Sequence, residues 1–161
     1  MKYLPYERIT YKTNLSEQEV LTRLSGFVEP KKSGLGRNPI KDYEGSINKN
    51  RFDISRVIKN RNSFLPQING AIQENNYGTE IEVTMKLDVL VFIFLIFWCS
   101  IAIGIFITIG LTEKIMSLEF FMPLLMLLFV YALAMVGFKI ESKKSKEYLR
   151  KNFEAEIIRE S

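Results

Sequence analysis

The sequence contains no histidine and only one cysteine, and both scarcities exclude chemistry. Without histidine, Ser-His-Asp, Cys-His and zinc-hydrolase mechanisms lose their usual base or ligand. The lone Cys99 can form neither an internal disulfide nor a cysteine-type metal site. The acidic residues Asp42, Asp53, Glu80 and Glu82 lie in predicted turns or on a predicted solvent-facing strand face. We therefore expect no enzyme, no metal and no cofactor.

The sequence also has little excess of charge of either sign. The chain has 22 Lys and Arg against 18 Asp and Glu, a net charge of +4, and no large basic block. This balance gives no reason to expect nucleic-acid binding, but it fits basic groups that lie near an anionic membrane surface. The N-terminal stretch MKYLPYERITYKTN lacks an apolar run of signal-peptide length, so we expect no cleavage there.

Two long apolar runs dominate what is present. Residues 89–111 contain no charge and no proline, and as a helix they would extend about 34 Å. A bilayer core is roughly 30 Å thick, so this run is long enough to cross it. A second apolar run covers residues 120–138. The pair predicts a transmembrane helical hairpin, and neither span carries a charge that would line an ion path.

A stripe of small residues lies within the first span. Ser100, Gly104 and Thr108 recur at every fourth position and would share one helix face. Small residues let helices approach closely in membranes, so this face is predicted to pack against another helix. That helix is either the second span or a helix of a neighbouring copy.

The basic residues beside the spans predict the orientation. Lys86 precedes the first span, and Lys139, Lys143, Lys144 and Lys146 follow the second. Because lysine and arginine flank spans on the cytoplasmic side, both termini should be cytoplasmic and the connecting loop outside. We expect the inner membrane as the location, and a lone unpaired cysteine fits a reducing compartment.

Residues 1–88 are predicted to form one small α+β domain. Residues 7–12 are rich in β-branched and aromatic side chains, which favours a first strand. Ser16 fits the N-cap of a helix whose apolar residues lie at positions 20, 21, 24 and 28, and Pro30 would stop it. Four alternating runs follow, at residues 43–47, 52–58, 68–72 and 79–87.

Each of these runs has apolar residues on one face only. That pattern is typical of an antiparallel meander with one covered and one wet face, and the helix from Ser16 is the simplest cover. The predicted order is β-α-β-β-β-β. Only Asp88 separates the last strand from the first span, so the domain should sit directly on the membrane.

The stretch 29–41 contains four basic residues, two glycines and two prolines. Lys31, Lys32, Arg37 and Lys41 are candidates for contacting an anion or lipid headgroups. The alternative that we favour is a solvated surface loop, because the glycines lack the spacing and setting of a phosphate-binding loop.

Arg56 interrupts an apolar strand face, and Gly70 does so on the next strand. If the two strands form a hairpin, the two positions come close to opposite each other, and the glycine leaves room for a guanidinium. Arg56 would then hold an anionic ligand or a partner's carboxylate. The favoured alternative is a bulge that turns Arg56 outward, or a stem that reaches the sheet edge.

Phe64 lies in the corner formed by residues 62–66, which is rich in turn and capping residues. It is either displayed for a partner or buried as a core plug. We favour the core plug.

The tail, residues 139–161, is predicted to be a charged helix that continues the second span. Leu149, Phe153 and Ile157 recur at every fourth position and form a narrow apolar stripe. Three placements are open for this stripe: on lipid headgroups, docked on the soluble domain, or paired between copies. Docking is preferred because the tail is only weakly basic beyond Lys146.

The run RNSFLPQINGAIQENNYGTEIEVTM, preceded by RFDISRVI, resembles small bacterial membrane proteins in which a cytosolic β-rich domain precedes two membrane helices. The likeness covers roughly residues 43–111. It implies the architecture and a bacterial source, and it transfers no activity and no site residue.

Two functions fit these features. The first is a non-enzymatic binding or scaffold module, held at the inner membrane surface and engaging a protein partner or further copies. The second is a ligand-gated effector, in which Arg56 and the loop cations sense a small anion and the hairpins assemble into a pore.

Overall fold

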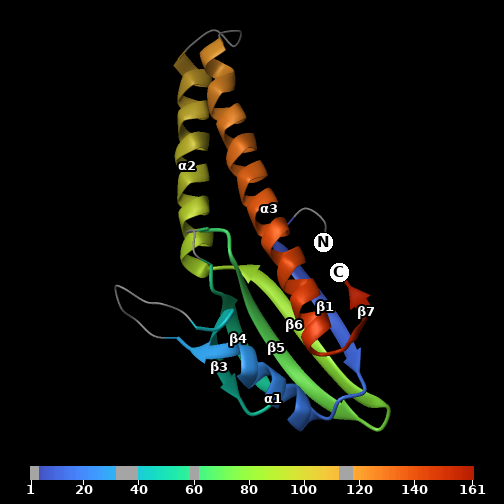
Figure 1. The fold of residues 1–161 in the computed structure, drawn as a ribbon. Helices are drawn as coiled ribbons and strands as arrows, with labels where there is room; N and C mark the ends of the chain where they lie inside the picture. The colour runs from blue at the N-terminus through green and yellow to red at the C-terminus, as the bar shows by residue number, and fades with distance from the viewer. Residues whose placement is uncertain (1–3, 32–39, 59–61, 113–117) are drawn as a thin grey trace.

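The computed structural model describes residues 4–31, 40–58, 62–112 and 118–161, and it shows a curved sheet from which two long helices project (Figure 1). The described elements, in chain order, are β1 (Tyr6–Thr13), α1 (Glu17–Phe27), β2 (Val28–Pro30), β3 (Tyr43–Asn48), β4 (Arg51–Arg56), β5 (Pro66–Asn75), β6 (Gly78–Leu87), α2 (Val89–Thr112), α3 (Leu118–Asn152) and β7 (Glu156–Glu160).

The sheet has seven strands in the order β2-β3-β4-β5-β6-β1-β7. The predicted meander is present as β3 to β6, and β1 pairs antiparallel with β6. The sheet is mixed rather than purely antiparallel, because β2 runs parallel to β3. The predicted sequence of elements lacked β2 and β7, which form the two edges of the sheet.

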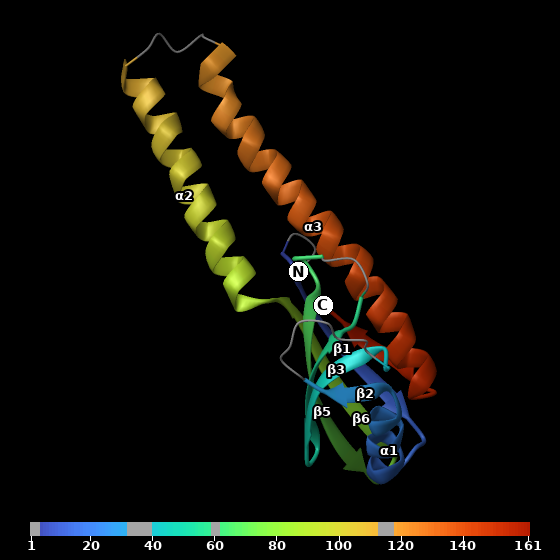
Figure 2. The same ribbon diagram turned by 60° about the vertical axis from the view of Figure 1, so that its left-hand side comes forward.

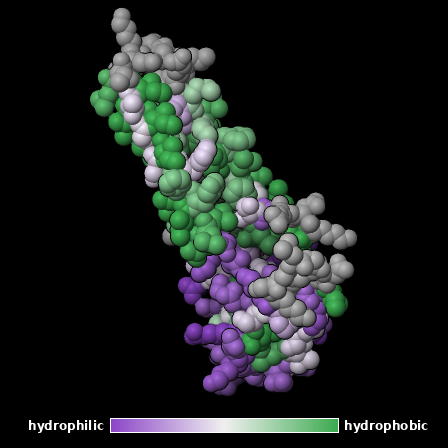
Figure 3. Space-filling model, turned by 90° about the vertical axis from the view of Figure 1, so that its left-hand side faces the viewer, coloured by the Kyte–Doolittle hydropathy of each residue, from purple (hydrophilic) through white to green (hydrophobic). Residues whose placement is uncertain are grey.

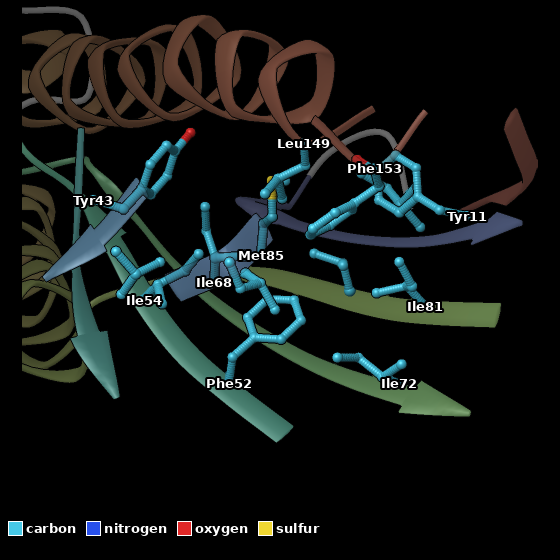
Figure 4. Close-up of a cluster of buried hydrophobic side chains, with 14 of the residues drawn as sticks. Tyr11, Tyr43, Phe52, Ile54, Ile68, Ile72, Ile81, Met85, Leu149 and Phe153 are labelled. Atoms are coloured by element: carbon cyan, nitrogen blue, oxygen red, sulfur yellow. The ribbon is translucent and has the colours of Figure 1, made fainter. Parts of the chain in front are cut away.

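Two helices cover one face of the sheet, whereas the sequence predicted one. Helix α1 begins with the expected cap: the Ser16 hydroxyl accepts from the Glu19 backbone N–H, and the Glu19 carboxylate accepts from the Ser16 N–H. The second cover is the C-terminal part of α3, which contributes Phe138 and Leu149 to the core, and Phe153, directly after the helix, joins them. Figure 4 shows Leu149 and Phe153 facing side chains of the sheet.

Helix α3 is 35 residues long, about 52 Å, and it continues without a break from its apolar half into its charged half (Figure 2). The prediction of a helical tail to residue 161 is wrong. The helix ends at Asn152, and Glu154 adopts a left-handed conformation with φ of 48°. The Ala155 N–H donates to the Arg150 carbonyl at 3.0 Å and the Glu154 N–H to that of Lys151 at 3.3 Å, which is a Schellman motif.

After this cap the chain forms β7, which pairs antiparallel with β1. Docking of the tail on the domain is therefore confirmed for Leu149 and Phe153, which are fully buried. Ile157 also packs against the core, but it does so from a strand and not from a helix. The tail completes the domain.

Helices α2 and α3 project beyond the sheet as an apolar pair. Asp88 caps α2 directly after β6 by accepting from the Leu90 N–H at 2.8 Å, so no linker separates sheet and helix. Val89–Leu111 and the apolar half of α3 are long and apolar enough to cross a membrane. In Figure 3 this hydrophobic region contrasts with the hydrophilic surface of the sheet domain. Only 6% of the most apolar window of α2 is buried, so α2 is not the core helix of the fold.

Candidate functional site

The charged part of α3 meets the sheet through ion pairs, and Arg56 belongs to one of them. Arg56 lies at the end of β4 on the covered face, where its guanidinium lies 2.9 Å from the Glu141 carboxylate. The Glu141 side chain is only 10% exposed and also accepts from Lys144 at 2.8 Å. Arg56 thus binds a carboxylate, as one interpretation of the sequence proposed, but that carboxylate belongs to its own chain.

The expected juxtaposition of Arg56 and Gly70 is wrong. Gly70 faces Phe52 across the β4–β5 pair, and a Cβ on Gly70 would lie 2.1 Å from the Phe52 ring. The glycine therefore makes room for an aromatic ring in the core. Arg56 faces Tyr43 on β3, and the β4–β5 register continues to Ser55 without a bulge that would turn Arg56 outward.

The loop cations have different surroundings. The Lys41 ammonium donates to the carbonyls of Ser25 and Val28 at the end of α1, where a cation suits the helix dipole. Lys31 is exposed beside β2. Lys32 and Arg37 lie outside the described residues. The structure therefore gives Arg56 and Lys41 separate partners, on α3 and α1 respectively.

A second ion pair lies where α3 changes from apolar to charged. Lys139 is the first charged residue after the apolar half, and its ammonium lies 2.6 Å from the Glu7 carboxylate on β1. The Glu7 side chain is only 9% exposed. In both pairs the carboxylate is nearly buried and the cation is partly exposed, so loss of the cation would leave a nearly buried charge uncompensated, which is destabilising. The two pairs therefore hold α3 at a fixed position on β1 and β4.

Aromatic side chains from the sheet, α1 and α3 pack together near Arg56. The ring of Tyr43 lies 5.6 Å from that of Phe27 and 5.1 Å from that of Tyr148, and the Tyr148 hydroxyl donates to Asp42 at 2.7 Å. The Tyr43 and Ser145 hydroxyls are buried and have no hydrogen-bond partner among the described residues. Burial raises the pKa of Tyr43, against smaller opposing effects of the nearby Ser145 hydroxyl and Arg56.

Phe64 connects the β4–β5 loop to the base of the helix pair. Its ring is partly buried and packs against the core and against Gly137 of α3, which agrees with the core-plug interpretation except that the ring keeps an exposed part. A Cβ on Gly137 would lie 2.9 Å from Phe64 Cδ2. Next to the ring, a hollow of about 460 Å³ opens towards Leu90 and Phe94 of α2. Phe64 therefore lies close to both helices.

The small-residue stripe of α2 is not buried against α3, although Ser100 lines a groove between the two helices. Ser100, Gly104 and Thr108 are exposed, and a Cβ on Gly104 would meet no atom within 4 Å. The contact with α3 instead includes Ala102, which is 4% exposed, and Ala134 of α3 is buried in the same way. Close packing against the second span is therefore absent at Gly104, and packing of the stripe against a neighbouring copy stays a prediction.

Sequence reasoning missed the roles of Glu7, Lys139 and Glu141. The available signal for Glu141 was its position as a lone acidic residue among the lysines that follow the second apolar run. Within the described residues no group of three acidic or cysteine side chains is placed to hold a metal ion. Comparison of the chain with protein-family models, curated proteins and solved structures finds no match. The function that we propose therefore rests on the contacts that join the helix pair to the sheet, which we call the junction.

Proposed function

We propose that this chain is an integral membrane protein whose α+β domain is a non-enzymatic binding or scaffold module, held rigidly at the inner membrane surface. The observation that carries the proposal is the continuity of α3. One helix supplies half of the exposed apolar pair and part of the core of the domain. The rigidity of the tie distinguishes this module from a domain on a flexible tether.

The exposed apolar surface supports insertion. Helix α2 extends about 36 Å and residues 118–138 of α3 about 31 Å, and both lengths match a bilayer core. Side chains such as Leu90, Phe97 and Leu128 are more than 60% exposed in the isolated chain. Soluble proteins rarely expose contiguous apolar surface on this scale, whereas lipid would cover it without cost.

Topology and charge support the orientation. Helix α2 leaves the domain and α3 returns to it, so the domain and the described parts of both chain ends lie on the same side of the membrane in this proposal (Figure 1). The lysines at positions 86, 139, 143, 144 and 146 lie at that side, which favours the cytoplasm. A bacterial inner membrane is the setting that we propose.

The fixed geometry of the junction supports a scaffold role. Asp88 leaves no slack before α2, Phe64 packs at the base of the pair, and two ion pairs hold α3 on the sheet. A domain held in this way presents its uncovered sheet face at a constant height and angle above the bilayer. That suits recognition of a membrane-bound protein partner or of further copies, and we propose no nucleic-acid partner.

The ligand-gated effector ranks second. Rigid coupling between sheet and hairpin suits transmission of a signal, but Arg56 already binds Glu141. A small anion would have to displace that carboxylate. Ion flux across liposomes that contain the purified protein, measured with and without added nucleotides, tests this function. Flux that rises with nucleotide supports it, and absence of flux under every condition refutes it.

The scaffold proposal is tested by crosslinking in native membranes, followed by detergent extraction and native mass spectrometry. We expect a defined complex with a partner or further copies. The Glu141→Gln variant removes the charge that Arg56 binds, so it should loosen α3 and lower the yield of the complex. Lys143→Gln is the matched control, because Lys143 is exposed and makes no ion pair with a described residue. A strictly monomeric protein without partners would refute the proposal.

A further inference from the structure

A groove runs along one side of the α2–α3 pair. It has a volume of about 410 Å³, and its walls reach from Phe92 to Ile103 on α2 and from Leu127 to Met135 on α3. Leu4 and Pro5, from the segment before β1, line it at the end nearest the sheet domain. The groove is therefore built by three separate parts of the chain.

The length of the groove matches one leaflet of a bilayer. Phe92 and Ile103 are about 16 Å apart along the helix axis. Half of a hydrocarbon core of roughly 30 Å is about 15 Å. The α3 wall agrees, because Leu127 lies about 16 Å from Phe138, where the apolar half of that helix ends. The groove thus extends from the domain side of the membrane to about its middle.

The lining of the groove favours a hydrocarbon chain. Its walls consist almost entirely of aliphatic and aromatic side chains, which an acyl chain can contact along the whole length of the groove. A polar ligand does not suit it, because the walls are almost entirely apolar and the Ser100 hydroxyl already donates to the Ile96 carbonyl at 2.9 Å.

A cation lies just beyond the end of the groove near the domain. Lys139 follows Met135 by one helical turn on α3, and its side chain is 39% exposed. One N–H of its ammonium reaches Glu7, which leaves two N–H groups of the three. A phosphate at the inner surface of the membrane could accept from these groups. The charge at this position complements an anionic headgroup.

We propose that the groove binds one acyl chain of an anionic inner-leaflet phospholipid whose phosphate contacts Lys139. This inference rests on the proposed membrane insertion. The lipid fills the space between α2 and α3 and contacts Leu4 and Pro5, so it links the hairpin to the start of β1. The bound lipid is therefore a structural partner of the junction.

Native mass spectrometry of protein reconstituted in vesicles of equal parts phosphatidylcholine and phosphatidylglycerol tests the proposal after extraction in mild detergent. We expect one retained lipid per chain, with phosphatidylglycerol at least threefold preferred. Ser100→Phe and Ile96→Trp add bulk in the groove and should lower retention at least fivefold. Gly104→Phe is the matched control, because a side chain at Gly104 points into open space, and it should retain the lipid.

The role of the headgroup has its own variant. Glu7→Gln combined with Lys139→Gln removes both charges of the pair at once, so neither is left unpaired. This double variant should keep one lipid but lose the preference for phosphatidylglycerol. Two filling variants are used because either one alone could disturb folding, and circular dichroism of each confirms its helix content.

The outcomes separate the two proposals. Insertion is measured first, by flotation with the vesicles after an alkaline carbonate wash. A protein that the wash removes refutes membrane insertion and the lipid site together. A protein that stays inserted but retains no lipid, or retains equal amounts in the filled and control variants, refutes the lipid site alone. A dimer that the filling variants abolish, in place of a lipid, also refutes it and assigns the groove to a second copy.

Discussion

The contact between Phe64 and Gly137 yields the most detailed prediction. Gly137→Ala places a Cβ 2.9 Å from Phe64 Cδ2 and 3.1 Å from its Cβ, closer than such atoms normally approach. Overpacking of this kind costs about 1 to 3 kcal/mol. Replacement of glycine by alanine within a helix returns up to about 1 kcal/mol. We therefore expect a net destabilisation of about 0 to 2 kcal/mol.

Removal of the Phe64 ring should turn the effect of Gly137→Ala on stability from destabilising to stabilising. In a Phe64→Ala background the new Cβ meets no ring, so Gly137→Ala should stabilise by about 0.5 to 1 kcal/mol through helix propensity alone. The double-mutant cycle then has a coupling energy of about 1 to 3 kcal/mol. Gly104→Ala is the matched control because a Cβ there meets no atom within 4 Å, and it should show no coupling to Phe64.

The assay is reversible unfolding of the purified protein in detergent micelles, followed by circular dichroism. A coupling energy below about 0.3 kcal/mol, within the usual limit of additivity, would refute the argument. It would mean that Phe64 does not contact α3 in solution and that the loop after β4 does not hold the base of the pair.

Three further predictions concern the domain, and each is measured by the same unfolding assay. Leu149→Ala should destabilise by about 2 to 5 kcal/mol because Leu149 is fully buried, whereas Ile140→Ala, at an exposed position of the same helix, should change stability by less than about 0.5 kcal/mol. Tyr11→Phe should cost about 1 kcal/mol through its lost hydrogen bond to a backbone carbonyl, whereas Tyr43→Phe should be neutral or stabilising because the Tyr43 hydroxyl has no described partner. Burial raises the pKa of both tyrosines above the unfolded value near 10, so their contribution to stability is intact below about pH 10 and is lost as the pH rises further. Above about pH 10, each variant should therefore reduce the slope of the unfolding free energy against pH by about 1.4 kcal/mol per pH unit. Glu154→Gly relieves a left-handed conformation that costs about 1 to 2 kcal/mol, and it removes an exposed ion pair with Arg23 that contributes about 0 to 1 kcal/mol. The net effect should be stabilisation by about 1 kcal/mol, and destabilisation by more than about 1 kcal/mol would contradict the described helix cap.

Much of the fold was predictable where a pattern is long and periodic. The uncharged run at residues 89–111 and the alternation at residues 79–87 each extend over enough positions to identify a helix and a strand. The cap at Ser16 was predictable because its capping box is a local motif. These features depend on neighbours in sequence, which a single sequence shows.

The two edge strands were not predictable for opposite reasons. Strand β2 has only three residues, follows α1 directly and ends at Pro30, so it has no alternation to detect. Strand β7 was hidden because the spacing of Leu149, Phe153 and Ile157 fits a helix that in fact ends between the first two. The stop at Glu154 carries no glycine, which is the usual signal for this cap.

The site was predictable only in part, because it depends on register and on contacts distant in sequence. The alternation of residues 52–58 placed Arg56 on the covered face of its strand, and a guanidinium on that face predicts an anionic partner. Its partner Glu141 is 85 residues away, and no local pattern connects the two. The pairing of Gly70 with Phe52 instead of Arg56 follows from the length of the β4–β5 loop, which alternation does not determine.

The central claim is that α3 is one rigid helix from the membrane to the core of the domain. Hydrogen–deuterium exchange of the protein in liposomes tests it most directly, by mass spectrometry of peptides that cover residues 118–152. We predict slow exchange throughout, including residues 137–144, where the apolar half meets the ion pairs of Lys139 and Glu141. Rapid exchange confined to residues 137–144 would show a hinge between hairpin and domain, and it would contradict the account.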